Sequence, residues 1–147
     1  MDCIELLITR GAVVNRTTSY GWVAIMFSSK NGHLQCLKVL LDNGADVNAR
    51  DPEGGTSLMW ACENGHLACV DMLLEAGIDL DAVGGHGRTA LSYAAAYGHS
   101  SCIDAILSKS CGPLNTRDAA GDSALALASR RGHSAAVDVL LRYGGME

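Results

Sequence analysis

The stretch GHLACVDMLLEAG at residues 65–77 carries the pattern that decides the fold of this chain. Its opening Gly-His pair recurs, and the glycines, spaced 33, 33 and 34 residues apart, are Gly32, Gly65, Gly98 and Gly132. Two adjacent aliphatic residues recur with it, eight and nine positions after each glycine, at residues 40–41, 73–74, 106–107 and 140–141. A period held along 147 residues predicts a solenoid built from copies of one supersecondary unit.

Each unit is predicted to contain two short helices. In the unit that holds the quoted stretch, Thr56 can cap the first helix by accepting a hydrogen bond from a free backbone N–H. Gly65 ends that helix, because glycine adopts the left-handed conformation at little cost. Gly77 ends the second helix, whose apolar residues have the spacing of one buried face: Leu67, Val70, Leu73 and Leu74. Two such helices cannot bury their apolar faces alone, so neighbouring units must stack.

Short motifs in register with this period resemble those of the ankyrin repeat family. The segments 56–59 (TSLM), 89–92 (TALS) and 123–126 (SALA) resemble its Thr-Pro-Leu-His motif, and Gly44-Ala45-Asp46-Val47-Asn48 resembles its loop. The resemblance covers nearly the whole chain and implies an all-α, ankyrin-type helix–turn–helix solenoid with short turn or hairpin loops. No unit keeps the proline or the histidine of the motif. Since that histidine bonds neighbouring turns in the family, the resemblance implies somewhat weaker stacking here.

We expect a single ankyrin-repeat domain over residues 1–147, with four full repeats after a partial one. The limits are 1–17 for the partial repeat and then 18–50, 51–83, 84–117 and 118–147. The partial repeat supplies only a second helix, so we expect a piece of a longer polypeptide; a short natural protein with open ends is the alternative. The 34-residue interval adds one residue to the loop 108–115. There Ser110 replaces the expected glycine, and Gly112 is predicted to adopt the left-handed backbone angle.

Charge and composition exclude several classes of protein. The net charge is −5, whereas a domain that holds nucleic acid needs a basic surface, so no nucleic-acid partner is expected. No apolar run approaches the roughly 18 residues of a membrane span. The first residues lack the basic and apolar regions of a signal peptide. With free thiols, which suit a reducing compartment, these features predict a cytoplasmic or nuclear protein.

The six cysteines are predicted to be packing residues rather than disulfides or metal ligands. Cys3, Cys36, Cys69 and Cys102 recur every 33 residues, on helices that pack about 8–10 Å apart. That separation exceeds the limit of about 7 Å between Cα atoms for a disulfide. Only Cys111, in the irregular loop, is expected to be exposed. The periodic histidines are interpreted as structural turn residues, and we expect neither a metal nor a cofactor.

No catalytic site is predicted. No serine, cysteine or acid stands at a recognisable spacing from a base and an orienting partner, so we expect no enzyme activity and no small-molecule substrate. The glycine-rich stretch at residues 84–88 lacks the Gly-Lys-Ser/Thr ending of a phosphate-binding loop and is interpreted as a turn.

The resemblance implies binding of a protein partner through the concave face, at turn tips and exposed positions of the first helices. Aromatic residues and arginine dominate interface energies. At the turn tips and first-helix positions that the resemblance implies, aromatic or charged residues form the candidate partner-binding set: Tyr20, Trp22, Lys30, Trp60, Glu63, Arg88, Tyr97, Arg130 and Arg131. Trp22 and Tyr97 are expected to be exposed. For Phe27, Trp60, Tyr93 and Leu127, packing against the adjacent unit is an equal alternative.

The resemblance also marks Asn48 as a possible acceptor for asparagine β-hydroxylation, although most such asparagines only stabilise turns. The predicted function is that of a protein–protein interaction module, a scaffold or adaptor. The alternative is a regulatory or targeting domain of an enzyme whose catalytic part lies outside this chain.

Overall fold

The computed structural model describes residues 3–145, so the outer limits of the first and last expected repeats, residues 1 and 147, lie outside the described residues. Within 3–145 the chain forms nine α-helices and two short 3-10 helices, with no strand. Helix α1 stands alone, and the others form consecutive pairs: α1 (Cys3–Thr9), α2 (Ala24–Lys30), α3 (Leu34–Asp42), α4 (Ser57–Asn64), α5 (Leu67–Glu75), α6 (Ala90–Ala96), α7 (Ser100–Lys109), α8 (Ala124–Arg130) and α9 (Ser134–Arg142). The predicted all-helical solenoid is confirmed.

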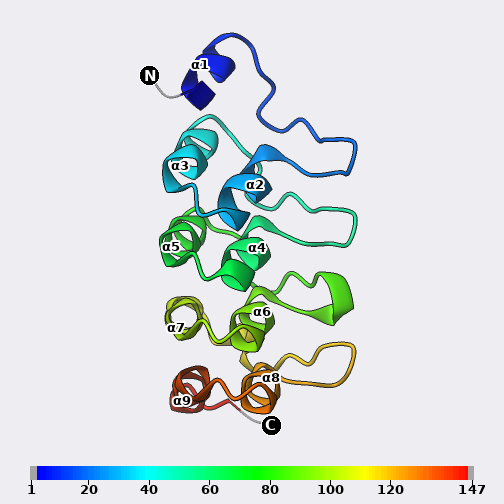
Figure 1. Cartoon of the computed structure of the whole chain (residues 1–147), viewed down its shortest axis with the longest axis vertical. Helices are drawn as coiled ribbons and strands as arrows, with labels where there is room; N and C mark the ends of the chain where they lie inside the picture. Colours follow the sequence, from blue (N-terminus) through cyan, green and yellow to red (C-terminus); the bar gives the residue numbers. More distant parts are fainter. Residues whose placement is uncertain (1–2, 146–147) are drawn as a thin grey trace.

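The pairs stack in one column, as Figure 1 shows. Helices α2, α4, α6 and α8 form an inner row beside the projecting loops, and helices α3, α5, α7 and α9 form an outer row. Each helix contacts its partner and the equivalent helices of the neighbouring pairs, and α1 extends the outer row by packing on α3. The loops between pairs leave the column on one side, where the 3-10 helix η1 (Gly85–Gly87) forms one of the tips.

The ends of the inner-row helices follow the local sequence signals. The Thr56 hydroxyl accepts a hydrogen bond from the Met59 amide at 3.4 Å, and Thr89 and Ser123 cap α6 and α8 in the same way. Gly65 has φ 72° at the end of α4, the left-handed conformation that the sequence predicts. Both the start and the end of α4 are therefore encoded by the residues that directly flank it.

The core runs along the column between the two rows. Small residues such as Ala61 and Ala94 are fully buried and allow the inner-row helices to approach closely. On the outer helix α5, Val70 and Leu73 are fully buried as predicted. The predicted burial of Leu67 is wrong, since this residue is 37% exposed. It begins α5 and lines an open hollow opposite short serine side chains of α7, which cannot cover it.

The irregular loop after α7 differs from the sequence prediction. Gly112 does not adopt a positive φ; it begins the 3-10 helix η2 (Gly112–Asn115), with Pro113 next. Proline fixes its own φ near the helical value, so the extra residue is absorbed as a tight turn instead of a left-handed one. Pro113 and Leu114 are buried and hold this loop against the stack, while Ser110 is extended with φ −160°.

The described cysteines are free thiols that mainly serve packing. Cys62, Cys69 and Cys102 are buried, Cys36 is half-buried and Cys111 is exposed, and the side chain of Cys3 lies outside the described part. Burial raises the pKa of the Cys62 thiol well above its ordinary value and that of Cys102 to about 11. The predicted burial of the periodic thiols is confirmed for Cys69 and Cys102 but only in part for Cys36, and the predicted exposure of Cys111 is confirmed. No helix in residues 3–145 is long and apolar enough to cross a membrane.

Candidate functional site

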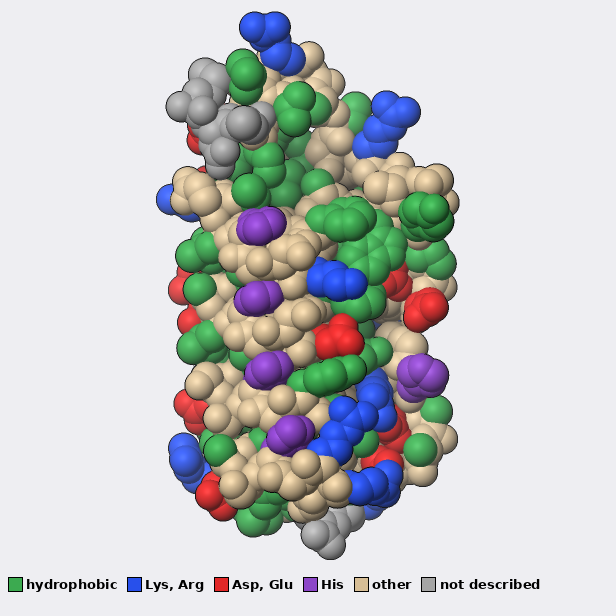
Figure 2. All heavy atoms as spheres, viewed as in Figure 1, with side chains coloured by type: hydrophobic (Ala, Val, Ile, Leu, Met, Phe, Trp, Pro, Cys, Tyr) green, Lys and Arg blue, Asp and Glu red, His purple; other side chains and the backbone are tan. Residues whose placement is uncertain are grey.

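Four aromatic side chains gather where the inner row meets the first loops, and we name them the aromatic cluster: Tyr20, Trp22, Phe27 and Trp60. The ring centroids of Trp22 and Phe27 lie 5.0 Å apart and those of Trp22 and Trp60 lie 4.6 Å apart. Tyr20 is 81% exposed and Phe27 46% exposed. Figure 2 shows the resulting hydrophobic patch in the upper half of this face. The rings of Tyr20 and Phe27 therefore present aromatic surface to solvent.

The two tryptophans are half-buried, so the predicted exposure of Trp22 needs correction. Its ring packs against that of Trp60, which comes from the next unit along the stack. Tilted aromatic pairs at such separations are favourable. Trp60 is further fixed because its indole N–H donates to a carboxylate oxygen of Asp51 at 3.2 Å. For Trp60 packing and display therefore coexist.

Lys30 lies over both indole rings. Its ammonium nitrogen is 5.3 Å from the Trp22 ring and 4.9 Å from the Trp60 ring, within the range of a cation–π interaction. The aromatic cluster borders two hollows. One, of about 210 Å³, lies between Tyr20, Trp22, Phe27 and Lys30. The other, of about 190 Å³, lies towards the loop tip.

The loop tip at residues 51–55 is built around the buried Asp51. One oxygen of its carboxylate accepts hydrogen bonds from the Glu53 amide at 3.0 Å and the Gly55 amide at 2.7 Å. The other oxygen accepts from the indole of Trp60. The equivalent Asp118 accepts from two amides of its own turn and from the Arg88 side chain. These aspartates shape the tips and set the position of the residues displayed there.

A second aromatic–cationic group lies farther down the inner row. The Arg131 guanidinium is 5.4 Å from the Tyr97 ring and donates to the Ala96 carbonyl at 2.9 Å. Tyr97 is 45% exposed, as the sequence predicts. Arg130 is exposed but forms a two-point ion pair with Asp122, with both N–O distances at 2.6 Å.

The structure thus divides the predicted partner-binding residues into groups. Tyr20, Trp22, Lys30 and Trp60 come together, and Tyr97 pairs with Arg131. Arg88 is partly buried and bonded to Asp118 at 3.1 Å, so its role is to join two loop tips. Glu63 is half-buried and borders a small hollow with Trp60. Leu127 is buried and packs, while Phe27 joins the aromatic cluster.

Sequence reasoning did not assign a role to Asp51. An Asp two to four residues before glycine-rich turn amides is a known signal for an Asx-type turn, and the Asp-Pro-Glu-Gly-Gly stretch carries it. The bond to Trp60 has no such local signal, because it depends on how the helix folds back towards the loop.

The periodic histidines link neighbouring units. The Nε2 atoms of His66, His99 and His133 each lie 3.0 to 3.1 Å from a backbone carbonyl of the preceding unit, and since a carbonyl only accepts, each Nε2 carries the proton. The opposite edge of each ring lies against a glycine that ends an inner-row helix. Figure 2 shows these histidines as a column along one face. Their predicted structural role is confirmed.

Asn48 also joins units. Its side-chain oxygen accepts a hydrogen bond from the Asp79 amide at 2.9 Å, and Asn15 does the same for Asp46 at 2.8 Å. Asn48 is exposed, and its β-hydroxylation stays a prediction. Peptide mass spectrometry of the native protein tests this prediction. If the peptide that contains Asn48 lacks the mass of one added oxygen, the prediction of hydroxylation is wrong.

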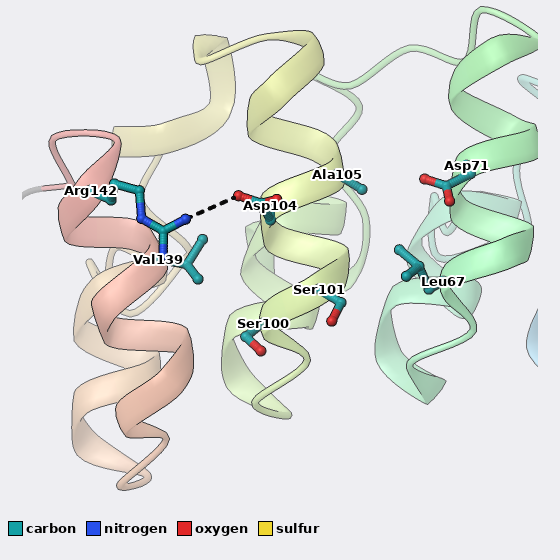
Figure 3. Close-up of a pocket in the computed structure, with 8 residues that line it drawn as sticks. All are labelled: Leu67, Asp71, Ser100, Ser101, Asp104, Ala105, Val139 and Arg142. Carbon is teal, nitrogen blue, oxygen red and sulfur yellow. Dashed lines mark ion pairs between the residues drawn. The ribbon is translucent and has the colours of Figure 1, made fainter.

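A wide hollow, of about 520 Å³, lies on the outer row, between α5, α7 and α9 (Figure 3). Ser100 and Ser101 line it, and Asp104 faces Arg142 across it at 3.7 Å. No histidine or cysteine is among its lining residues. The residues that line this hollow thus bring carboxylates, but no imidazole or thiol, to the serine hydroxyls. Among the described residues no cluster of three or more His, Cys, Asp or Glu is placed to hold a metal ion.

Stacked helix pairs that display side chains along one row and its loops define a helical repeat protein. The family model for ankyrin repeats in three copies matches residues 1–84 and 80–147. The chain belongs to the ankyrin repeat family. Ankyrin repeats are generally protein–protein interaction modules and typically non-catalytic. No curated protein matches the chain.

Proposed function

We propose that this chain is an adaptor or scaffold segment that binds a partner protein through the inner row and the loop tips. The aromatic cluster is the centre of this surface. The observation that carries the proposal is the exposure of Tyr20 and Phe27 beside two tryptophans that are already fixed by packing. Rings held in place lose little conformational freedom on binding, so their burial by a partner is favourable.

The second group supports a binding surface that extends down the inner row. Tyr97 presents its ring with Arg131 held against it, and Arg131 is itself anchored to a backbone carbonyl. Arginine and tyrosine are enriched among the residues that contribute most to interfaces. A partner that follows the row would contact the aromatic cluster first and this pair second.

The test is affinity capture from a native extract, with three forms of the chain compared by quantitative mass spectrometry. The Tyr20→Ala/Phe27→Ala variant removes the exposed rings of the aromatic cluster. The matched control, Leu34→Ala/Leu67→Ala, removes two apolar side chains of the outer row that are 38% and 37% exposed. Loss of about 2 kcal/mol at an interface hot spot weakens binding roughly 30-fold.

We expect specific partners to be retained by the wild type and by the outer-row control and to be lost from the aromatic variant. Equal retention by all three forms would contradict the assignment of the binding surface. Far-UV circular dichroism checks that each variant keeps its helices.

We also propose a cytoplasmic or nuclear location, supported by the buried free thiols Cys62, Cys69 and Cys102. Reduced thiols persist where glutathione and thioredoxin act. Fractionation of cells that carry the native protein tests this; recovery in the secreted fraction would contradict it.

A further inference from the structure

The hollow between Tyr20 of the first loop and the loop tip at residues 51–55 has a chemical character of its own, and we name it the tip hollow. It has a volume of about 190 Å³ and is lined by Tyr20, Trp22, Asp51, Pro52, Glu53 and Trp60. We propose that the tip hollow binds one basic side chain of the partner, through its ammonium or guanidinium group. This inference deepens the proposed function and rests on it.

The aromatic walls are suited to a cation. The face of an aromatic ring carries a partial negative charge, and tryptophan attracts cations most strongly. The chain itself provides an example, because the Lys30 ammonium lies 5.3 Å and 4.9 Å from the two tryptophan rings. Lys30 lines the neighbouring hollow and is not among the residues of the tip hollow. Tyr20, which also lines the tip hollow, is 81% exposed, so its ring is aromatic surface open to a second cation.

The remaining walls are acidic. Asp51 is buried and its carboxylate is held by two amides and the Trp60 indole, so it contributes fixed negative charge. Glu53 is exposed at the rim; one oxygen of its carboxylate lies near Gly85 of the next loop tip, and rotation of this exposed side chain brings the charge to a group bound in the tip hollow. No lysine or arginine lines the tip hollow. The lining residues of the tip hollow carry two negative charges and no positive one; the ammonium of Lys30, 5.3 Å and 4.9 Å from two of the lining rings, offsets only part of this charge.

These walls together select for one kind of side chain. An apolar side chain would cover the Glu53 carboxylate without replacing its water, which costs free energy. An acidic side chain would face two carboxylates of the same sign. A lysine or arginine side chain places its aliphatic stem along the rings and its charge beside Glu53. The tip hollow thus complements a basic residue.

The probes are capped tripeptides with lysine, arginine or uncharged norleucine between two glycines, added to the whole chain. Binding is followed by proton–nitrogen NMR at the indole N–H signals of Trp22 and Trp60, the two tryptophans of the sequence. We expect weak, saturable shifts with the lysine or the arginine peptide and none with norleucine. Comparison of the two basic peptides shows which cation the site prefers.

The variant Glu53→Gln is expected to weaken this binding about threefold to fivefold, the size of an exposed ion pair. The matched control is Glu75→Gln, which makes the same charge change on the exposed side of α5 and is expected to bind as the wild type does. Equal binding of the norleucine peptide, unchanged binding by Glu53→Gln, or no shift with either basic peptide would overturn the proposal.

The two proposals fail in different ways. If the Tyr20→Ala/Phe27→Ala variant loses the captured partners but no basic peptide binds, the proposed binding surface is supported and the proposal that the tip hollow binds a basic side chain is wrong. If the basic peptides bind at the tip hollow but capture is unaffected by the aromatic variant, the proposed function is wrong.

Discussion

Replacement of Gly65 by alanine should destabilise the stack through a contact with the next unit. Gly65 has φ 72°, and a Cβ at this position would lie 2.5 Å from Nδ1 of His99. A residue with a Cβ in the left-handed region costs about 1–2 kcal/mol. The imidazole must also move away, which breaks its 3.0 Å hydrogen bond to the Glu63 carbonyl and costs about 1 kcal/mol more. We expect a total loss of about 2–3 kcal/mol.

Gly44 provides the matched control. Its φ is 82°, so alanine there is strained in the same way, but nothing lies within 4 Å of the added Cβ. Gly44→Ala should therefore cost only about 1–2 kcal/mol. In a His99→Ala background the imidazole is absent, and Gly65→Ala should then cost no more than Gly44→Ala. The double-mutant cycle isolates the coupling between Gly65 and His99.

The assay is urea unfolding followed by far-UV circular dichroism, with the free energy of unfolding taken by linear extrapolation. Thermal midpoints should fall by roughly 4 °C for each kcal/mol lost in a chain of this size. Equal losses for Gly65→Ala and Gly44→Ala, or no coupling between positions 65 and 99, would refute the reasoning.

Two further predictions concern ionisable groups. Cys111 is exposed, whereas burial raises the pKa of Cys62 and Cys102, so a thiol reagent should label Cys111 before Cys62 and Cys102; peptide mapping that finds rapid labelling of Cys62 in the folded chain would contradict this. Burial alone would raise the pKa of Asp118, but two backbone amides and the Arg88 guanidinium lower it below its ordinary value. The ionised Asp118 carboxylate therefore stabilises the fold above the pKa of the unfolded state, and this stabilisation is lost as the pH falls through the lower folded pKa. The urea midpoint of Asp118→Asn should depend less on acid pH than that of the wild type. The same pH dependence in both proteins would argue against this role of Asp118.

The sequence predicted the parts of the fold that depend on local signals. The cap at Thr56 and the helix end at Gly65 depend only on residues a few positions away in the sequence, so a single unit encodes them. The predicted left-handed backbone angle of Gly112 is wrong because the neighbouring Pro113 favours a 3-10 turn. The predicted burial of Leu67 is wrong because it depends on the length of the side chains on α7, which the helical spacing of apolar residues does not indicate.

The candidate site was predictable as a region and not as a geometry. Family resemblance pointed to Tyr20, Trp22 and Trp60, and the structure brings them together. The stack of Trp22 on Trp60 joins residues of adjacent units, and the bond from Trp60 to Asp51 joins a helix to a loop tip. Both depend on tertiary packing, so no pattern along the chain reveals them. The acidic character of the tip hollow follows only once these contacts are known.

The column of histidines has a consequence for how such a chain changes in length. Each imidazole recognises a main-chain oxygen and the bare α-carbon of a glycine in the unit before it, as in the contact of His99 with Glu63 and Gly65. Because neither feature depends on the surrounding side chains, the contact between each histidine and the preceding unit has the same form at each of these junctions. Whole units could be gained or lost by duplication or deletion while the residues displayed on the inner row diverge freely.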